Sequence, residues 1–193
     1  MSCRALTALI TSLLLTASAA ANDAPALKAG VFSPARQAPD FSLQGSDGRE
    51  LKLSRYRGKV VVVGFGFTSC PDVCPTTLAT LAAARRELGA AAADVQVVYV
   101  TVDYERDVPE RMKKYLSAFD TTFVGGSGSA AQLAAVRKDY GISAEKKQYG
   151  DSYTYAHSSF TYLIDRGGRI RALMPYGHSP DDYAHDLAIL LKE

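Results

Sequence analysis

Two apolar runs separated by one helical pattern constrain the fold of this chain more than any other feature. Residues 60–67 and 95–102 are near-continuous apolar runs rich in valine, which is typical of strands buried on both faces of a sheet. Between them, residues 76–88 place apolar side chains at helical spacing, with Pro75 at the first turn and Gly89 as the stop. A strand, a helix and a second buried strand favour an α/β fold.

The rest of the chain supplies the other elements of such a fold. Alternating apolar residues on both sides of 45–48 predict a β-hairpin near the N-terminus, and 159–164 and 169–173 predict two strands joined by a tight turn. Helices are predicted at 109–119, 129–140 and 180–191, whereas 144–155 is polar and is expected to be irregular. This order describes a mixed sheet with helices on both faces and an N-terminal β-hairpin, and a thioredoxin-like type fits it best.

The first residues have the layout of an export signal. Arg4 precedes an apolar run at 5–17, which leads into small residues at 18–21, so we expect residues 1–21 to be a signal peptide cleaved after position 19, 20 or 21, with the protein released into the periplasm. The alternative is an uncleaved membrane anchor, although the run is short for one. Residues 22–36, rich in Ala, Pro, Lys and Gly, are expected to be a linker, and 37–193 one domain.

Charge and cysteine usage narrow the class of function. The chain has 22 Lys and Arg against 20 Asp and Glu, with no concentrated basic element, so nucleic-acid binding is not expected. Cys3 would leave with the signal peptide, so the mature protein retains two of its three cysteines. These are Cys70 and Cys74, four positions apart on a loop that enters a helix, a spacing that brings both sulfurs to one side within bridging or chelating distance. A helix N-terminus also favours the thiolate form.

A dithiol of this kind has several possible uses. A plain stabilising disulfide would close too short a loop to contribute much. Disulfide oxidoreductases normally have two residues between the cysteines and a proline facing them, but here there are three, and residues 155–159 hold no proline. The pattern of a thiol peroxidase is also absent before Cys70. Metal binding remains, and two soft thiolates with one imidazole suit copper(I), whereas structural zinc would require four protein ligands.

The chain offers three histidines as the imidazole. His185 lies within the last predicted helix and is expected to be a solvated helix residue, and His178 lies in the loop before that helix. His157 precedes a buried strand, where it could lean over the helix that begins near Pro75. The residues alone leave open whether His157 is a ligand or a structural histidine.

Four segments together resemble one known family. They are GFGFTSCPDVCP at 64–75, VDYERDVPE at 102–110, FVGG at 123–126 and HSSFTYLID at 157–165. In this order they are similar to the Sco/SenC family of copper-binding, thioredoxin-like proteins, over residues 39–191. The resemblance implies that Cys70, Cys74 and His157 bind copper and that the protein helps to build the copper A centre of cytochrome c oxidase.

Two positions at which members of the family carry acidic residues bear on that resemblance. Asp103 matches an acidic position near the family's metal site, where it would support the ligands, but an Asp that caps the following turn is an equal interpretation. Many members carry Asp immediately before the histidine, where this chain has Ala156. Tuning of the imidazole by an adjacent carboxylate is therefore not expected here.

The resulting hypothesis is a periplasmic copper metallochaperone and not a turnover enzyme. It would hold one copper ion, as Cu(I), Cu(II) or both, and deliver it to, or prepare, the copper A-bearing subunit of cytochrome c oxidase. Its other expected partners are another periplasmic copper chaperone or a thioredoxin-like reductase, and membrane contact would come only through an N-terminal anchor. The main alternative is a thiol-disulfide reductase that keeps the acceptor's cysteines reduced, and a weaker one is a redox sensor or thiol peroxidase.

Overall fold

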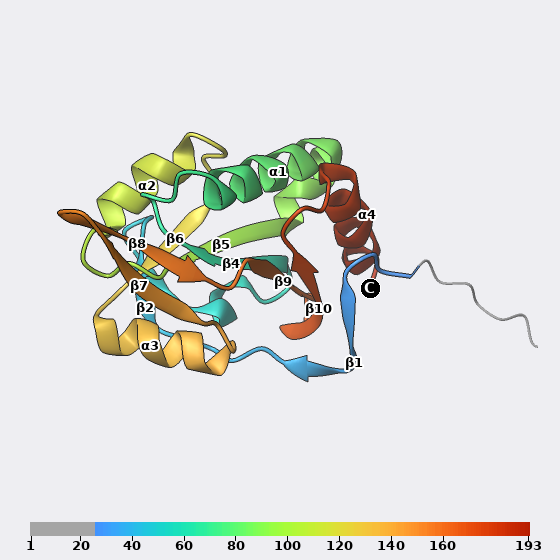
Figure 1. Ribbon diagram of the computed structural model, residues 1–193. Helices are drawn as coiled ribbons and strands as arrows, with labels where there is room; N and C mark the ends of the chain where they lie inside the picture. The colour runs from blue at the N-terminus through green and yellow to red at the C-terminus, as the bar shows by residue number, and fades with distance from the viewer. Residues whose placement is uncertain (1–25) are drawn as a thin grey trace, which may run out of the picture.

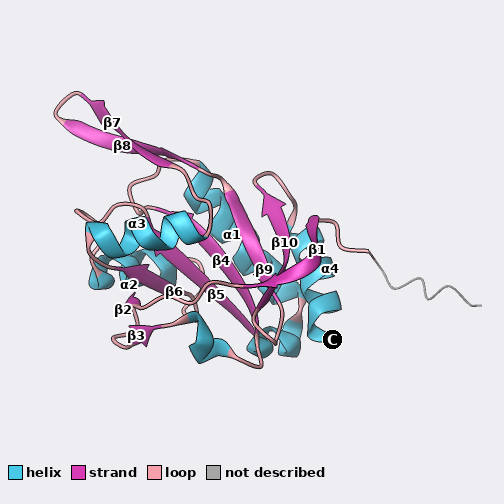
Figure 2. Cartoon of the chain, turned by 90° about the horizontal axis from the view of Figure 1, so that it is seen from below, coloured by secondary structure: helices cyan, strands magenta, loops and turns pink. Residues whose placement is uncertain are grey.

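An eight-stranded mixed sheet forms the centre of the protein. The computed structural model describes residues 26–193, so the predicted signal peptide lies outside the described residues. The central strands run parallel, and all other neighbours in the sheet are antiparallel. In spatial order (Figures 1 and 2) the strands are β1 (Gly30–Gln37), β10 (Arg169–Pro175), β9 (Phe160–Ile164), β4 (Val60–Gly66), β5 (Val95–Thr101), β6 (Val124–Ser127), β2 (Leu43–Gly45) and β3 (Glu50–Leu51).

Helices cover both faces of this sheet, as predicted. Helices α1 (Val73–Glu87), α2 (Pro109–Ser117) and α4 (Pro180–Leu191) lie on one face, and α3 (Ala130–Asp139) lies on the other (Figure 1). Short 3-10 helices at Leu53–Tyr56 and Gly89–Asp94 complete the connections. The predicted α/β fold class, with its β2–β3 hairpin near the N-terminus, is confirmed. Within residues 26–193, no helix combines the length and apolar character needed to span a bilayer.

Strands β4 and β5 place the chemistry at one edge of the sheet. Every residue of both strands is buried and the two pair in parallel from Val60 opposite Val95 to Gly66 opposite Thr101, because helices cover both of their faces. Their carboxyl ends therefore meet at the same edge, where helix N-termini also lie. The loop before α1 and the segment before α2 both leave from this edge.

The predicted linker is partly wrong. Residues 30–36 belong to β1, which pairs antiparallel with β10 at the edge of the sheet. Before β1, the backbone N–H groups of Lys28 and Ala29 donate to the buried Asp186 carboxylate of α4, at 2.8 and 2.9 Å. An edge strand is held through its backbone and leaves its side chains exposed, so apolar periodicity does not reveal it.

Two further elements were not expected from the sequence. Residues 144–155, predicted to be irregular, form most of a two-stranded hairpin of β7 (Ala144–Tyr149) and β8 (Ser152–His157), which pairs with no strand of the main sheet (Figure 2). Strand β7 is almost fully exposed and β8 is at most half-buried, which explains the polar sequence. Strand β6 holds Gly125 because a Cβ there would lie 2.8 Å from Met112 of α2, so the close helix requires glycine in the strand.

Candidate metal centre

The fold brings the two thiols and one imidazole together. Cys70 lies in the loop after β4, Cys74 in the first turn of α1 and His157 at the end of β8. The Cys74 backbone N–H donates to the Cys70 sulfur at 3.4 Å, and the Cys74 sulfur lies 3.6 Å from His157 Nε2. Both thiols are free; Cys70 is partly exposed and Cys74 is buried. The helix begins at Val73, earlier than position 76 predicted by periodicity, so that its first turn contains Cys74 and Pro75.

The orientation of His157 leaves one ring nitrogen directed at the sulfur. Its Nδ1 lies 2.8 Å from the Ser158 carbonyl oxygen. Because a carbonyl only accepts, Nδ1 carries the proton and Nε2 has a free lone pair facing Cys74. The edge of the His157 ring also packs on Phe67. A fixed tautomer with a free Nε2 is the arrangement found for imidazole ligands of metals.

The two thiols have opposite shifts in pKa. A hydrogen bond from the Cys74 thiol lowers the pKa of Cys70 to about 4; burial opposes this shift, and hydrogen bonds from backbone N–H groups at the helix start support it. The pKa of Cys74 is raised because the neighbouring Cys70 sulfur and burial both disfavour a second thiolate. In the reduced protein near neutral pH, the pair therefore holds one proton, with the thiolate on the more exposed Cys70.

A buried acid that the sequence reasoning passed over holds the cysteine loop. The Asp107 carboxylate, with no exposed surface, accepts from the Thr68 backbone N–H at 2.9 Å, from the Thr68 hydroxyl at 2.5 Å and from the Thr101 hydroxyl at 2.7 Å. Arg111 of α2 donates to the hydroxyls of Thr68 and Ser69, at 2.7 and 2.9 Å. Asp107 lies in the 102–110 motif, but nothing local in the sequence indicates that its partners precede Cys70.

Asp103 holds the hairpin that carries His157. It is buried, and its carboxylate pairs with the Arg106 guanidinium and accepts from the Tyr153 hydroxyl of β8 at 2.9 Å. It also accepts from the Arg106 backbone N–H at 3.3 Å, which is the turn-capping interaction expected as one interpretation of this residue. Arg106 lies 3.8 Å from the centre of the Tyr153 ring and donates to the Tyr153 carbonyl at 3.1 Å. Asp103 thus acts on the site through the position of β8.

The other two histidines lie in α4 and in the loop just before it, and neither has a hydrogen bond to a thiol among the described residues. His178 pairs with Asp182 at 3.2 Å, and His185 pairs with Asp186 at 2.9 Å. Asp182 also completes the capping box of α4 with Ser179. The sequence placed His185 in the last helix and His178 in the loop before it, and the structure has them there.

The donor set suits a soft metal ion. Two sulfurs and one imidazole nitrogen converge, whereas Asp103 and Asp107 at the same edge are already engaged by arginine, tyrosine and threonine. Within the described residues, no three His, Cys, Asp or Glu side chains form a ready-made metal site. Three-coordinate binding by soft donors is suited to Cu(I), whereas a structural zinc site requires a fourth ligand.

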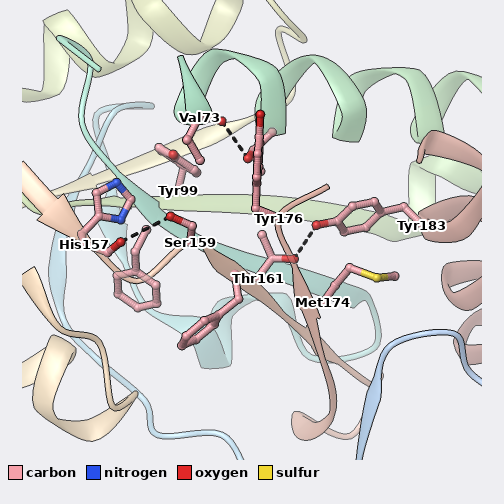
Figure 3. Close-up of a pocket in the computed structure, with 11 residues that line it drawn as sticks. Val73, Tyr99, His157, Ser159, Thr161, Met174, Tyr176 and Tyr183 are labelled. Carbon is pink, nitrogen blue, oxygen red and sulfur yellow. Dashed lines mark hydrogen bonds between the residues drawn. The ribbon is translucent and has the colours of Figure 1, made fainter. Parts of the chain in front are cut away.

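A small cavity adjoins the imidazole on the face covered by α1 and α4. Figure 3 shows Tyr99, His157, Ser159 and Thr161 among its lining residues. Tyr99 comes from β5, and its phenol lies beside Cys74 and acts to lower the pKa of that thiol against the larger effects of Cys70 and burial. The sequence reasoning treated Tyr99 only as part of a buried strand.

Comparison with known proteins gives a consistent result. The SCO1/SenC family matches residues 32–192. The SCO2-like protein of Rickettsia conorii is 35% identical over 133 residues, which are 67% of this chain and 65% of that protein. The mitochondrial SCO2 homolog of Bos taurus is 38% identical over 133 residues, 67% of this chain and 50% of that protein. The matched region thus spans less than two thirds of the length of these relatives.

Solved structures agree in fold. The structure of Bradyrhizobium japonicum ScoI with copper bound has a TM-score of 0.75 and 36% identity, covering 80% of this chain and 99% of that one. Yeast Sco1 with copper bound has a TM-score of 0.73 and 26% identity, covering 82% and 90%. Since the family match covers most of the chain, and relatives and solved structures support it independently, this protein belongs to the SCO1/SenC family.

Proposed function

We propose that this protein is a copper carrier that binds one copper ion through Cys70, Cys74 and His157. The observation that carries the proposal is the 3.6 Å approach of the Cys74 sulfur to His157 Nε2, with Nδ1 held by a carbonyl and the Cys70 sulfur beside the same helix turn. Cys74 and His157 are 83 positions apart in the sequence. An imidazole that served packing alone would not direct a free lone pair at the thiol in this way.

The chemistry of the donors supports copper over other metals. Thiolates are soft ligands that select Cu(I), and an imidazole also suits Cu(II), so the same site accommodates both valences. The solved relatives from Bradyrhizobium japonicum and yeast are described with copper bound. Copper binds thiolates strongly. The chain would provide the Cys70 thiolate, the Cys74 thiol, which would lose its proton on binding, and the oriented imidazole of His157.

The acceptor is proposed from family membership. We place the carrier in the periplasm, where it would deliver copper to, or prepare, the copper A-bearing subunit of cytochrome c oxidase. Another periplasmic copper chaperone or a thioredoxin-like reductase is the expected upstream partner. Export by residues 1–21 is part of this proposal, and intact-mass analysis of exported protein tests it, because a retained Met1 in a membrane fraction would establish the anchored alternative.

One observation favours a second function, thiol-disulfide reduction. Cys70 is partly exposed and its pKa is lowered to about 4, so it is a thiolate that can attack a disulfide, with Cys74 available to resolve the mixed disulfide. Such a reductase would keep the acceptor's cysteines reduced. Exchange of this kind requires both sulfurs and no imidazole ligand.

Substitution of His157 separates the two functions. The reduced wild-type protein should retain one copper per chain in competition with a small thiol, and the oxidised protein should retain little, because the disulfide consumes both thiolates. His157→Ala should weaken retention by more than about tenfold, the loss seen when even a supporting group of a metal site is removed, while most of the rate of model-disulfide cleavage remains. His178→Ala is the matched control and should change neither property.

Two results would overturn the copper carrier. One is equal copper retention by the oxidised and reduced proteins, and the other is full retention by His157→Ala together with normal oxidase assembly at limiting copper. Cys70→Ser and Cys74→Ser should each abolish both copper retention and disulfide cleavage.

A further inference from the structure

A tyrosine from the neighbouring strand reaches the buried thiol through a slot lined by glycines. Tyr99 is 2% exposed and pairs across the parallel register with Gly64. A Cβ on Gly64 would lie 2.9 Å from the Tyr99 ring. A Cβ on Gly66 would lie 2.0 Å from the Tyr99 hydroxyl oxygen and 2.8 Å from the Cys74 sulfur. The absence of side chains at these two positions is therefore what lets the phenol reach the sulfur.

The Tyr99 hydroxyl and the Cys74 sulfur both lie close to the position that a Cβ on Gly66 of β4 would take. A buried tyrosine hydroxyl ordinarily pairs with an acceptor, and the Cys74 sulfur is the acceptor that lies there. Tyr99 is also one of the influences that lower the pKa of Cys74. Figure 3 shows Tyr99 and His157 approaching the α1 N-terminus from different strands. The Cys74 sulfur is thus contacted by the imidazole and by the phenol.

A second buried phenol provides a contrast. Tyr115 of α2 is close enough to both thiols for their charge to act on its pKa, which is raised mainly by burial. Its hydroxyl has no hydrogen-bond partner among the described residues. Both tyrosines therefore lie near the pair, and among the described residues Tyr99 is the one whose hydroxyl lies beside the Cys74 sulfur.

We propose that Tyr99 is a positioning residue that donates a hydrogen bond to the Cys74 sulfur when this sulfur holds copper, and that it shifts the bound ion towards Cu(I). The inference rests on the proposed role of Cys74 as a copper ligand. A hydrogen bond withdraws electron density from a thiolate, so the sulfur stabilises Cu(II) less, and hydrogen bonding around a cysteine ligand is known to tune copper potentials. The bond to copper remains, while the one-electron equilibrium between the two valences moves.

The test compares two substitutions that each remove one hydroxyl. Tyr99→Phe keeps the ring in its slot, and Tyr115→Phe is the matched control. Copper-loaded proteins are poised at a fixed ambient potential with mediators, and Cu(II) is quantified by electron paramagnetic resonance. In Tyr99→Phe the ratio of Cu(II) to Cu(I) should rise at least about threefold, which for one electron corresponds to a potential lower by about 28 mV. Tyr115→Phe should match the wild type.

A second measurement uses the vibrational spectrum of the copper-loaded wild-type protein. The copper–sulfur stretching band of the Cu(II) protein should shift on transfer to D2O, since the donated hydrogen exchanges, and this sensitivity should disappear in Tyr99→Phe. An unchanged ratio in Tyr99→Phe with one copper still bound, or an equal rise in Tyr115→Phe, would overturn the inference and leave the proposed function standing. Failure of the wild type to bind copper would overturn both.

Discussion

The hairpin that carries His157 should loosen when a single hydroxyl is removed from it. Tyr153→Phe deletes the donor that bonds the buried Asp103 carboxylate at 2.9 Å, and it keeps the ring that stacks with Arg106. The hairpin has only two strands and pairs with no strand of the main sheet, and an isolated two-stranded hairpin is marginally stable at best in water. Its order therefore depends on contacts of this kind with the body of the protein.

The size of the effect follows from the charge and exposure of the partners. A hydrogen bond to a charged group contributes about 1.5–3 kcal/mol. The tyrosine is only partly buried, so water offsets some of the loss, and about 1–2 kcal/mol should remain. Since about 1.4 kcal/mol corresponds to a tenfold change in an equilibrium constant, local opening of the hairpin should become roughly 5 to 25 times more frequent.

Hydrogen exchange measured by nuclear magnetic resonance reads this opening directly. Amides in the β7–β8 ladder should exchange faster by that factor, while those of β4 and β5 keep their rates. Tyr155→Phe is the matched control on the same strand, because its ring packs on Phe67 and its hydroxyl makes no side-chain hydrogen bond within residues 26–193. Unchanged exchange in the hairpin of Tyr153→Phe, or an equal increase in β4 and β5, would refute the reasoning.

Three further predictions concern the cysteine loop and its surroundings. Asp107→Asn should lower the free energy of unfolding by about 2–3 kcal/mol, because a buried acceptor of three hydrogen bonds loses its charge. Urea denaturation measures this free energy, and a loss below about 1 kcal/mol would contradict the assigned role. One thiol of the reduced protein, Cys70, should alkylate at nearly constant rate from about pH 8 to about pH 5 and slow only as the pH falls through about 4, since its depressed pKa keeps it ionised above that value; a rate that falls tenfold per unit below pH 8 would be that of an ordinary thiol. Gly66→Ala should destabilise the fold by about 1–3 kcal/mol through overpacking, whereas Gly30→Ala, whose Cβ would meet its nearest neighbour at an ordinary 3.5 Å, should change stability by less than about 0.5 kcal/mol in thermal unfolding.

Local sequence patterns were enough to predict the central strands, the helices and the thiol pair. Burial on both faces made β4 and β5 continuous apolar runs, and amphipathic spacing located all four helices to within a few residues. The four-residue separation of Cys70 and Cys74 at a helix start specified a thiol pair on one side of a turn. These features depend on neighbours within a few positions along the chain, so a sequence records them directly.

The edge strand β1, the glycine-containing strand β6 and the β7–β8 hairpin are formed by contacts that no local sequence pattern shows. Strand β1 is held by backbone pairing with β10, and Lys28 just before it donates to Asp186 of α4, 158 positions along the chain. Strand β6 is shaped by Met112 of α2, which lies over Gly125. The β7–β8 hairpin has a polar sequence because β7 is almost fully exposed and β8 is at most half-buried. Apolar periodicity reports burial alone, and these strands are stabilised by other means.

The same division holds for the candidate site. The sequence identified Cys70, Cys74 and His157 as the candidates, but it left open whether the imidazole was a ligand, because its distance from the sulfur depends on how the hairpin docks. Only the tertiary structure placed Asp107 under the cysteine loop and the Tyr99 hydroxyl beside Cys74. A sequence specifies which chemical groups are available within one turn or strand, whereas the pairing of groups tens of residues apart is determined by the packing that closes the chain around them.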